Sequence, residues 1–170
     1  TQMLKENTFC DVLIVGGGLT GLLCAFELIE SGADASGIFI IDKNKICSGT
    51  TTLSTAKLTA QHRLIYDTLI SKFGIELASQ YATANSNAVK RAFVIADIIG
   101  GSEAIKSIPS AVYAESGAEM KKIEAEAKAA RALGFDAEII VDTDLPFSIE
   151  GALRFNRQAA INPGRFCQKL

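Results

Sequence analysis

Two short apolar runs near the N-terminus show no alternation between polar and apolar residues. The first run extends from about residue 10 to residue 15, and the second covers residues 38–41. Strands covered on both faces of a parallel sheet have this continuous apolar character. Between the runs, apolar positions from Leu22 to Ile29 follow helical spacing and stop near Ser31 and Gly32. The pattern predicts a strand–helix–strand unit of the α/β class.

A glycine-rich turn joins the first predicted strand to the helix, with the spacing Gly16-x-Gly18-x-x-Gly21. Gly16 permits a tight turn, Gly18 lets backbone approach a pyrophosphate without a Cβ between them, and Gly21 allows close packing of helix on strand. The N–H groups at the start of the helix favour an anion. This context predicts a dinucleotide site, whereas a bare glycine turn also occurs without any ligand.

An acidic residue, Asp42, ends the second predicted strand. A carboxylate at this position can accept hydrogen bonds from both hydroxyls of an adenosine ribose, which favours an unphosphorylated ribose. The strand–helix–strand unit is shared by FAD and NAD sites, so these residues alone leave both cofactors open.

A segment rich in hydroxyls and small side chains follows, from Cys47 to Leu58. Its hydroxyl and backbone N–H groups can line phosphates or a flavin edge, and a helix beginning near Ser54 would add its positive end. The simpler alternative is a solvated loop that caps a helix.

The rest of the chain predicts two further long elements and several strands. Apolar positions recur at helical spacing over residues 76–99 before Gly100 and Gly101, and a capping box at Ser116 and Glu119 opens a helix that runs to Gly134. Shorter patterns predict strands at 111–114, 137–141 and 151–155, and a last helix capped by Asn162 with Pro163 as its first residue.

Composition and charge narrow the classes of function. The chain has 170 residues, 48% of them hydrophobic, which suits an ordinary globular fold. Its formal charge of −2 gives no basic footprint for nucleic acid, so a small-molecule substrate is the expected partner. The apolar run 12–26 is bracketed by Asp11 and Glu27 and is too short to cross a bilayer, so no membrane span is expected.

No residue type in the chain forms a catalytic or metal-binding pattern. The four cysteines are far apart and lack metal-ligand spacing, which favours reduced thiols in a cytoplasmic protein: Cys10, Cys24, Cys47 and Cys167. His62, the single histidine, and Tyr81, on the predicted helical stripe, are interpreted as structural. We therefore assign no catalytic residue and no metal ligand from sequence.

Three stretches together resemble a known family. Residues 12–42, the segment Ser48-Gly49-Thr50-Thr51 and the stretch from Gly151 to Pro163 resemble the D-amino-acid-oxidase-type superfamily of FAD-dependent oxidoreductases, which includes glycine oxidase and dimethylglycine dehydrogenase relatives. Residues 49–62 look most similar to bacterial members that continue into a C-terminal Rieske domain. The resemblance implies a Rossmann-like FAD/NAD(P)-binding βαβ unit, a helical excursion and part of a mixed substrate-side sheet.

The resemblance also assigns cofactor contacts. The glycine turn would hold the FAD pyrophosphate, Asp42 the ribose and Lys43 the adenine side, while the segment from Ser48 onward would line the pyrophosphate and isoalloxazine. Relatives that bind flavin covalently through histidine have that histidine where this chain has Leu53, so non-covalent FAD is expected. The full set of expected contacts is Gly16, Gly18, Leu19, Thr20, Gly21, Asp42, Lys43, Ser48, Gly49, Thr50, Thr51, Ser54, Thr55, Ala56, Lys57 and Leu58.

The implied activity is oxidation of a small amine or amino acid, with hydride passing from the carbon next to nitrogen to flavin N5. An NAD-dependent dehydrogenase and a non-catalytic dinucleotide-binding module are the alternatives. By the resemblance the chain is expected to be an N-terminal portion, inactive alone, with residues 1–75 in the FAD domain, 76–158 in the excursion and partial substrate domain, and 159–170 starting a return to the FAD domain. An incomplete sheet would expose apolar surface and favour self-association.

Overall fold

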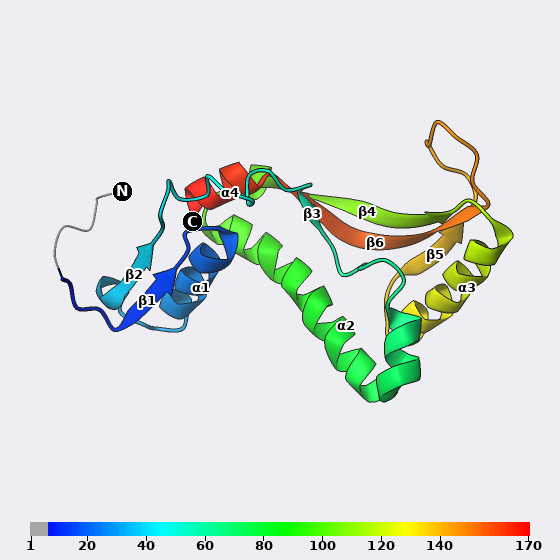
Figure 1. Cartoon of the computed structure of the whole chain (residues 1–170), viewed down its shortest axis with the longest axis horizontal. Coiled ribbons are helices and arrows are strands. Elements are labelled where there is room, and N and C mark those ends of the chain that lie inside the picture. The colour runs from blue at the N-terminus through cyan, green and yellow to red at the C-terminus, as the bar shows by residue number, and fades with distance from the viewer. Residues whose placement is uncertain (1–6) are drawn as a thin grey trace. The chain divides into compact units, whose positions relative to one another are not determined.

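The computed structural model describes residues 7–170, and the chain forms two compact units (Figure 1). One unit contains residues 7–56, 96–104 and 161–170, and the other contains residues 57–95 and 105–160. Each unit is therefore discontinuous in sequence. The three segments expected from the family resemblance follow sequence order, and they remain a prediction about domains.

The first unit is built on the predicted strand–helix–strand motif. Strand β1 (Val12–Val15), helix α1 (Leu19–Glu30) and strand β2 (Ile38–Ile41) follow in order, with a short 3₁₀ turn at Ala35–Gly37 before β2. The strands are parallel, and Val12 pairs with Ile38 in register. Helix α1 ends at Glu30 with Ser31 as its C-cap, and Gly32 follows with a φ of 94°, where the sequence predicts the end of the helix. These features confirm the predicted α/β fold class.

Two short elements complete the first unit. A 3₁₀ turn at Ser102–Ala104 precedes β4, and helix α4 (Pro163–Lys169) lies near the C-terminus. The Asn162 side chain caps α4 by accepting a hydrogen bond from the Arg165 N–H at 3.0 Å, and Pro163 opens the helix. The cap predicted from sequence is confirmed.

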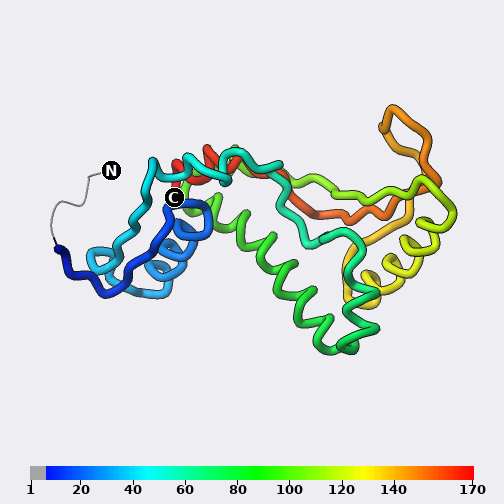
Figure 2. Tube along the Cα trace, viewed as in Figure 1, coloured from blue at the N-terminus to red at the C-terminus, as the bar shows by residue number. Residues whose placement is uncertain are grey.

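The second unit holds a four-stranded sheet in the order β3-β6-β4, with β5 also paired to β6. The strands are β3 (Lys57–Leu58), β4 (Ile105–Ala114), β5 (Ala137–Ile140) and β6 (Gly151–Ile161), and β6 is antiparallel to both β3 and β5. Strands β4 and β6 run side by side in the trace (Figure 2). Both are longer than the sequence predicts. Pro109 lies within β4, which a strand at the edge of a sheet tolerates.

The two helices of this region differ in how well sequence places them. Helix α3 (Gly117–Ala132) begins at the predicted capping box, where the Ser116 hydroxyl accepts from the Glu119 N–H. Helix α2 (Tyr66–Ile98) begins ten residues before the predicted start at 76. The chain breaks helical geometry at Gly74 (φ 80°, ψ 165°), so the sequence pattern captured only the part after this kink.

The core of the second unit is aromatic and alanine-rich. Tyr66, Leu153 and Phe155 are fully buried, and Ile123 of α3 is 1% exposed. Phe135 joins the rings of Tyr66 and Phe155, with centroid distances of 4.8 and 5.0 Å. Such tilted aromatic contacts add to the energy of burial. This core fixes one face of the sheet that carries β3.

Candidate cofactor site

The glycine turn of the first unit has the geometry that its sequence predicts. Gly16 adopts a φ of 112°, a conformation that side chains disfavour. A Cβ on Gly21 would overlap the carbonyl oxygen of Gly16, so only glycine allows α1 to lie this close to the end of β1. A Cβ on Gly18 would lie 3.2 Å from Thr51 Oγ1. The turn therefore presents bare backbone at the carboxyl end of β1.

The N-terminus of α1 carries free donor capacity. Gly18 is the N-cap and supplies no side-chain cap, and the first intrahelical bond joins the Leu22 N–H to the Gly18 carbonyl at 3.0 Å. The Thr20 and Gly21 N–H groups precede that bond and have no acceptor within the helix. The Leu19 N–H donates to Thr51 Oγ1 at 3.1 Å. The helix end can bind a pyrophosphate through these amides.

Asp42 lies at the end of β2 and is exposed to solvent. Its Oδ1 accepts from the Asn44 N–H and its Oδ2 from the Gly17 N–H, both at 2.8 Å. The bond from Asn44 lowers the pKa of the Asp42 carboxyl most, and the bond from Gly17 lowers it further. The nearby positive charge of Lys43 acts in the same direction, so the pKa lies below its ordinary value. A carboxylate offers about four acceptor positions, so the ionised group keeps capacity for two ribose hydroxyls.

An open hollow of about 560 Å³ lies where β1 and β2 end. Ligands of open α/β sheets bind at the carboxyl ends of the parallel strands, which is where this hollow is placed. The residues that line it are Val15, Gly16, Ile41, Asp42 and Lys43. Three of these were predicted as cofactor contacts, and the bare glycine backbone beside an ionised carboxylate fits the ribose and pyrophosphate of an adenine dinucleotide.

The hydroxyl-rich segment after β2 forms turns, and the helix predicted to begin near Ser54 is absent. Hydroxyls within the segment bond to nearby carbonyls, Ser48 Oγ to Lys45 and Thr52 Oγ1 to Gly49, at 2.7 and 3.2 Å. Such local side-chain bonds compete with helix formation. Cys47 and Ala56 also take positive φ values of 60° and 61°, which interrupt any helix.

The predicted contacts divide between the two units. Those from Gly16 to Ala56 belong to the first unit, where Cys47 connects the segment to the glycine turn by donating its N–H to the Gly17 carbonyl at 2.9 Å. Lys57 and Leu58 form β3 in the second unit, paired with Ala160 and Ala159. Their assignment as cofactor contacts remains a proposal.

Two residues that donate hydrogen bonds to the Asp42 carboxylate were not predicted from the sequence. Gly17 donates to Asp42, and a Cβ on it would lie 3.0 Å from Ile46 Cγ1. Asn44 supplies the second amide. The run of three glycines signalled that Gly17 is also constrained, whereas nothing in the residue type of Asn44 indicates the role of its backbone.

Two cysteines of the first unit lie in contact. The Cys167 thiol is buried on α4, and this burial, followed by its interaction with the Cys47 thiol, raises the pKa of Cys167 to about 12. Within residues 7–170, no group of histidine, cysteine and acidic side chains gathers as metal ligands would. Both cysteines are free thiols.

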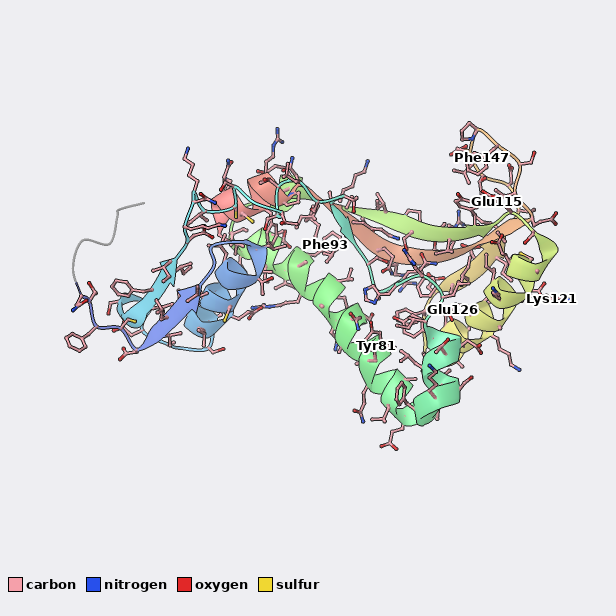
Figure 3. The ribbon with its side chains drawn as sticks, in the orientation of Figure 1. Tyr81, Phe93, Glu115, Lys121, Glu126 and Phe147 are labelled. Carbon is pink, nitrogen blue, oxygen red and sulfur yellow. The ribbon has the colours of Figure 1, made fainter. Side chains whose placement is uncertain are left out.

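His62 and Tyr81 also meet, although sequence gave neither a chemical role. His62 Nδ1 lies 2.9 Å from the Tyr81 hydroxyl, and Tyr81 packs edge-on against Tyr66 with ring centroids 6.2 Å apart. Tyr81 lies on α2 (Figure 3). Tyr81 thus borders the core, as an aromatic on a helical stripe is expected to do. Neither residue is assigned a catalytic role.

Fold and site together define a dinucleotide-binding α/β unit with a glycine turn and an acidic ribose position. Residues 11–170 match the family described as FAD dependent oxidoreductase (DAO), and the chain belongs to this family. The match confirms the family predicted from sequence. Among the helices of residues 7–170, none is both long and apolar enough to cross a membrane.

Individual relatives agree with this assignment. YhfW of Bacillus subtilis (strain 168), named for a Rieske 2Fe-2S iron-sulfur protein, is 35% identical over 98% of this chain, which spans 32% of YhfW. Gamma-glutamylputrescine oxidoreductase of Escherichia coli (strain K12) is 31% identical over 44% of this chain and 17% of its own length. Glycine oxidase from Geobacillus kaustophilus shares the fold, with a TM-score of 0.70, 19% identity and coverage of 96% of this chain and 43% of that chain.

Proposed function

We propose that this chain supplies the adenine-dinucleotide cradle of an FAD-dependent oxidoreductase that oxidises a small amine or amino acid. The observation that carries the proposal is the bare turn at Gly16 and Gly18 facing the ionised Asp42, in a chain that belongs to the FAD-dependent family. Bound FAD would supply the acceptor for a hydride from the substrate carbon next to nitrogen.

The residues of this chain have binding and orienting tasks in that proposal. Amides of Thr20 and Gly21 bind the pyrophosphate, and Asp42 accepts from the ribose hydroxyls. The hydroxyls from Ser48 to Thr55, in the same unit, line the rest of the cofactor. Leu53 is 83% exposed and offers no nucleophile, so binding is non-covalent.

The substrate class rests on the relatives. Glycine oxidase and gamma-glutamylputrescine oxidoreductase are named for amino compounds, which supports an amine or amino-acid substrate. Reactions of this type depend on placing the substrate carbon against the flavin, so they need no side-chain base from this chain. The likeness to YhfW supports electron transfer to an iron–sulfur centre in place of oxygen.

Strand β1 supports a proposal about association. Leu13 and Val15 are 53% and 78% exposed on it. An apolar edge strand of this kind is prone to pair with another chain, so we expect the 170-residue chain to self-associate. Its cytoplasmic location stays a prediction.

Retention of FAD tests the proposed function directly. The purified chain is mixed with excess FAD, desalted and examined for a flavin absorbance band. Gly21→Ala forces α1 away from β1, so we expect it to weaken FAD binding roughly tenfold or more. Gly117→Ala is the matched control, because a Cβ there meets no atom within 4 Å. Equal retention by all three proteins, or none by the unmutated chain, would contradict the proposal.

A further inference from the structure

A hollow of about 450 Å³ lies within the second unit. All of its lining residues belong to this unit, whereas the glycine turn and Asp42 belong to the first. Helix α2 forms one wall, and strands β4 and β6 with the turn before β5 form the rest. Small-molecule sites have volumes of about 300–1,000 Å³, so a hollow of this size can hold a small ligand.

One face of α2 gives the hollow an apolar wall with a charged edge. The α2 residues that line it are Ser86, Val89, Lys90 and Phe93, which follow the i, i+3, i+4, i+7 spacing of a single helical face. Val89 is 5% exposed, Phe93 is partly buried, and Lys90 is exposed. Phe93 lies on α2 (Figure 3). The same wall therefore offers apolar surface and a cation to one ligand.

Positive charge exceeds negative charge at the hollow. Lys90 and Arg157 are its cations, and Asp136 is the one acid among the described residues that line it. Both oxygens of Asp136 are already engaged, since Oδ1 accepts from Asn156 Nδ2 at 3.2 Å and Oδ2 lies 3.4 Å from Arg157 Nε. Within residues 7–170, Lys90 forms no ion pair. Two cations against one carboxylate leave one unbalanced positive charge.

A buried amide of the hollow keeps an unused hydrogen-bond donor. Gln158 is 5% exposed, and its Oε1 accepts from Thr59 Oγ1 at 3.0 Å and from the Ala60 N–H at 2.8 Å, which fixes the orientation of the amide. Its Nε2 carries two N–H groups, of which one donates to the Asn156 carbonyl at 2.9 Å. The other has no acceptor among the described residues. A buried donor gains when a ligand oxygen supplies that acceptor.

Two hydroxyls add to this surplus of donors. Ser86 and Ser107 line the hollow from α2 and β4, and neither hydroxyl has a hydrogen-bond partner in the part of the chain that the structure describes. A hydroxyl can donate to a ligand oxygen. The hollow therefore favours a ligand rich in acceptors.

Arg157 lines the hollow in a strained backbone conformation. Its φ of 57° lies in the left-handed region that non-glycine residues rarely adopt. Strain of this kind is found most often at ligand and active sites. Only the Nε side of the guanidinium faces Asp136, and the side chain is 86% exposed. The remaining N–H groups form a planar fork that suits the two oxygens of a carboxylate.

We propose that this hollow binds a small carboxylate that carries an apolar body. Lys90 and Arg157 bind the carboxylate, and the free N–H of Gln158 donates to it as well. The apolar body packs against Val89 and Phe93. One unbalanced positive charge matches the single charge of a carboxylate better than the nearly double charge of a phosphate group. The inference goes beyond the proposed function and does not depend on it, because no residue of the glycine turn takes part.

Calorimetric titration of the chain without FAD tests this site. Phenylacetate is the probe, and phenylacetamide has nearly the same shape without the charge. We expect one phenylacetate to bind per chain, and phenylacetamide to bind at least about tenfold more weakly, because it cannot form charge-assisted hydrogen bonds. Acetate keeps the carboxylate and lacks the ring, so it should also bind at least about tenfold more weakly.

Two variants each remove one cation from the hollow. We expect Lys90→Gln and Arg157→Asn to raise the dissociation constant for phenylacetate about tenfold. Asparagine tolerates left-handed backbone, so Arg157→Asn keeps the local conformation. Lys128→Gln is the matched control, because Lys128 is exposed on α3 and does not line the hollow. Lys90→Arg, which keeps the charge, should retain the binding that Lys90→Gln loses.

The side-chain amide of Gln158 gives a second readout by nuclear magnetic resonance. We expect phenylacetate to shift the N–H signals of this amide, because the free N–H gains an acceptor. The signals of Gln80, exposed on α2, should stay unchanged. Binding that leaves the Gln158 signals in place would put the ligand elsewhere and overturn the proposal.

The other outcomes also decide. Equal binding of phenylacetate and phenylacetamide, equal losses in Lys90→Gln and Lys128→Gln, or no binding by the unmutated chain would each overturn the carboxylate site. Tighter binding of inorganic phosphate than of phenylacetate would overturn the assignment to a carboxylate. Retention of FAD by the same preparation reports on the proposed function separately, so a chain that binds phenylacetate and no FAD would contradict that function alone.

Discussion

The two units of this chain shape their backbone by opposite means. In the first unit, the cofactor turn depends on side chains that are absent, since a Cβ on Gly21 would overlap the Gly16 carbonyl and Gly16 takes a φ that side chains disfavour. In the second unit, polar side chains lie in the interior, where Glu126 and Gln61 are almost completely buried. The first arrangement keeps backbone available to a ligand. In the second arrangement, the buried polar groups form hydrogen bonds with one another and with the backbone of the same unit.

This contrast determines how each unit can be broken. The glycine turn fails when atoms are added, because the added carbon meets backbone that cannot move aside. The buried network fails when atoms are removed, because the remaining donors lose their acceptors. Substitutions of opposite kinds therefore separate cofactor binding in one unit from stability in the other.

Removal of the Glu126 carboxylate should have the largest effect. Glu126 lies on α3 and is 0% exposed, and its two oxygens accept from the N–H groups of Ile65, Tyr66 and Asp67 at 2.8 Å (Figure 3). It caps α2 from another helix. We expect Glu126→Ala to lower the free energy of unfolding by roughly 3–5 kcal/mol, because one buried and two partly buried N–H donors lose their acceptor. Urea denaturation followed by circular dichroism measures this.

Glu124→Ala is the control for that change, because Glu124 lies two residues earlier on α3 and is exposed. The loss of stability in Glu126→Gln should fall between those of the two alanine variants. The glutamine amide keeps one acceptor oxygen, but its NH2 group is a donor in place of the second oxygen. Equal losses in Glu126→Ala and Glu124→Ala would show that α2 needs no cap from α3.

The cysteines of the first unit should differ strongly in reactivity. Thiolate is the nucleophile, and the raised pKa of the Cys167 thiol keeps nearly all of it protonated at pH 8. Cys10 and Cys24 are exposed. We expect iodoacetamide at pH 8 to label Cys10 and Cys24 and to modify Cys167 at least 100-fold more slowly.

Peptide mass spectrometry over a time course measures this difference. Raising the pH toward the pKa of Cys167 should speed its labelling, because the thiolate fraction grows tenfold with each pH unit below that value. Labelling of Cys167 as fast as Cys10 would mean that α4 does not cover it in solution.

Local patterns made the first unit predictable. The strands at 12–15 and 38–41, the glycine turn and the cap at Asn162 depend on residues close in sequence, and the structure contains all of them. The helix expected near Ser54 failed because the hydroxyls bond within the segment. The sequence signal was a helix cap, and a turn uses the same residue types.

The hydrogen bond between Thr59 and Gln158 in the second unit was not predictable in this way. Gln158 and Thr59 are 99 residues apart in sequence, and neither amide nor hydroxyl stands out in its local pattern. The early start of α2 was hidden for the same reason, since its cap, Glu126, comes from α3. Long-range polar contacts depend on tertiary packing, which periodicity does not contain.

The smallest expected effect is on the surface of the second unit, where cross-strand partners Glu138 and Arg154 form an ion pair at 2.7 Å. The bonds from Arg154, then Asn156, lower the pKa of Glu138. A lowered folded-state pKa means that the pair stabilises the fold above the unfolded pKa of about 4.3, and that this contribution is lost as pH falls through the folded value. The side chains are 38% and 43% exposed, so solvent screens the pair.

Glu138→Gln should therefore lower the melting temperature slightly at pH 7 and leave it unchanged near pH 2, where the carboxyl of the unmutated chain is protonated as well. Thermal unfolding at the two pH values measures this, with Asp142→Asn, an exposed acid just after β5, as the matched loss of one charge. An equal decrease at both pH values would assign the effect to lost packing of the side chain, because an uncharged Glu138 cannot keep an ion pair with Arg154.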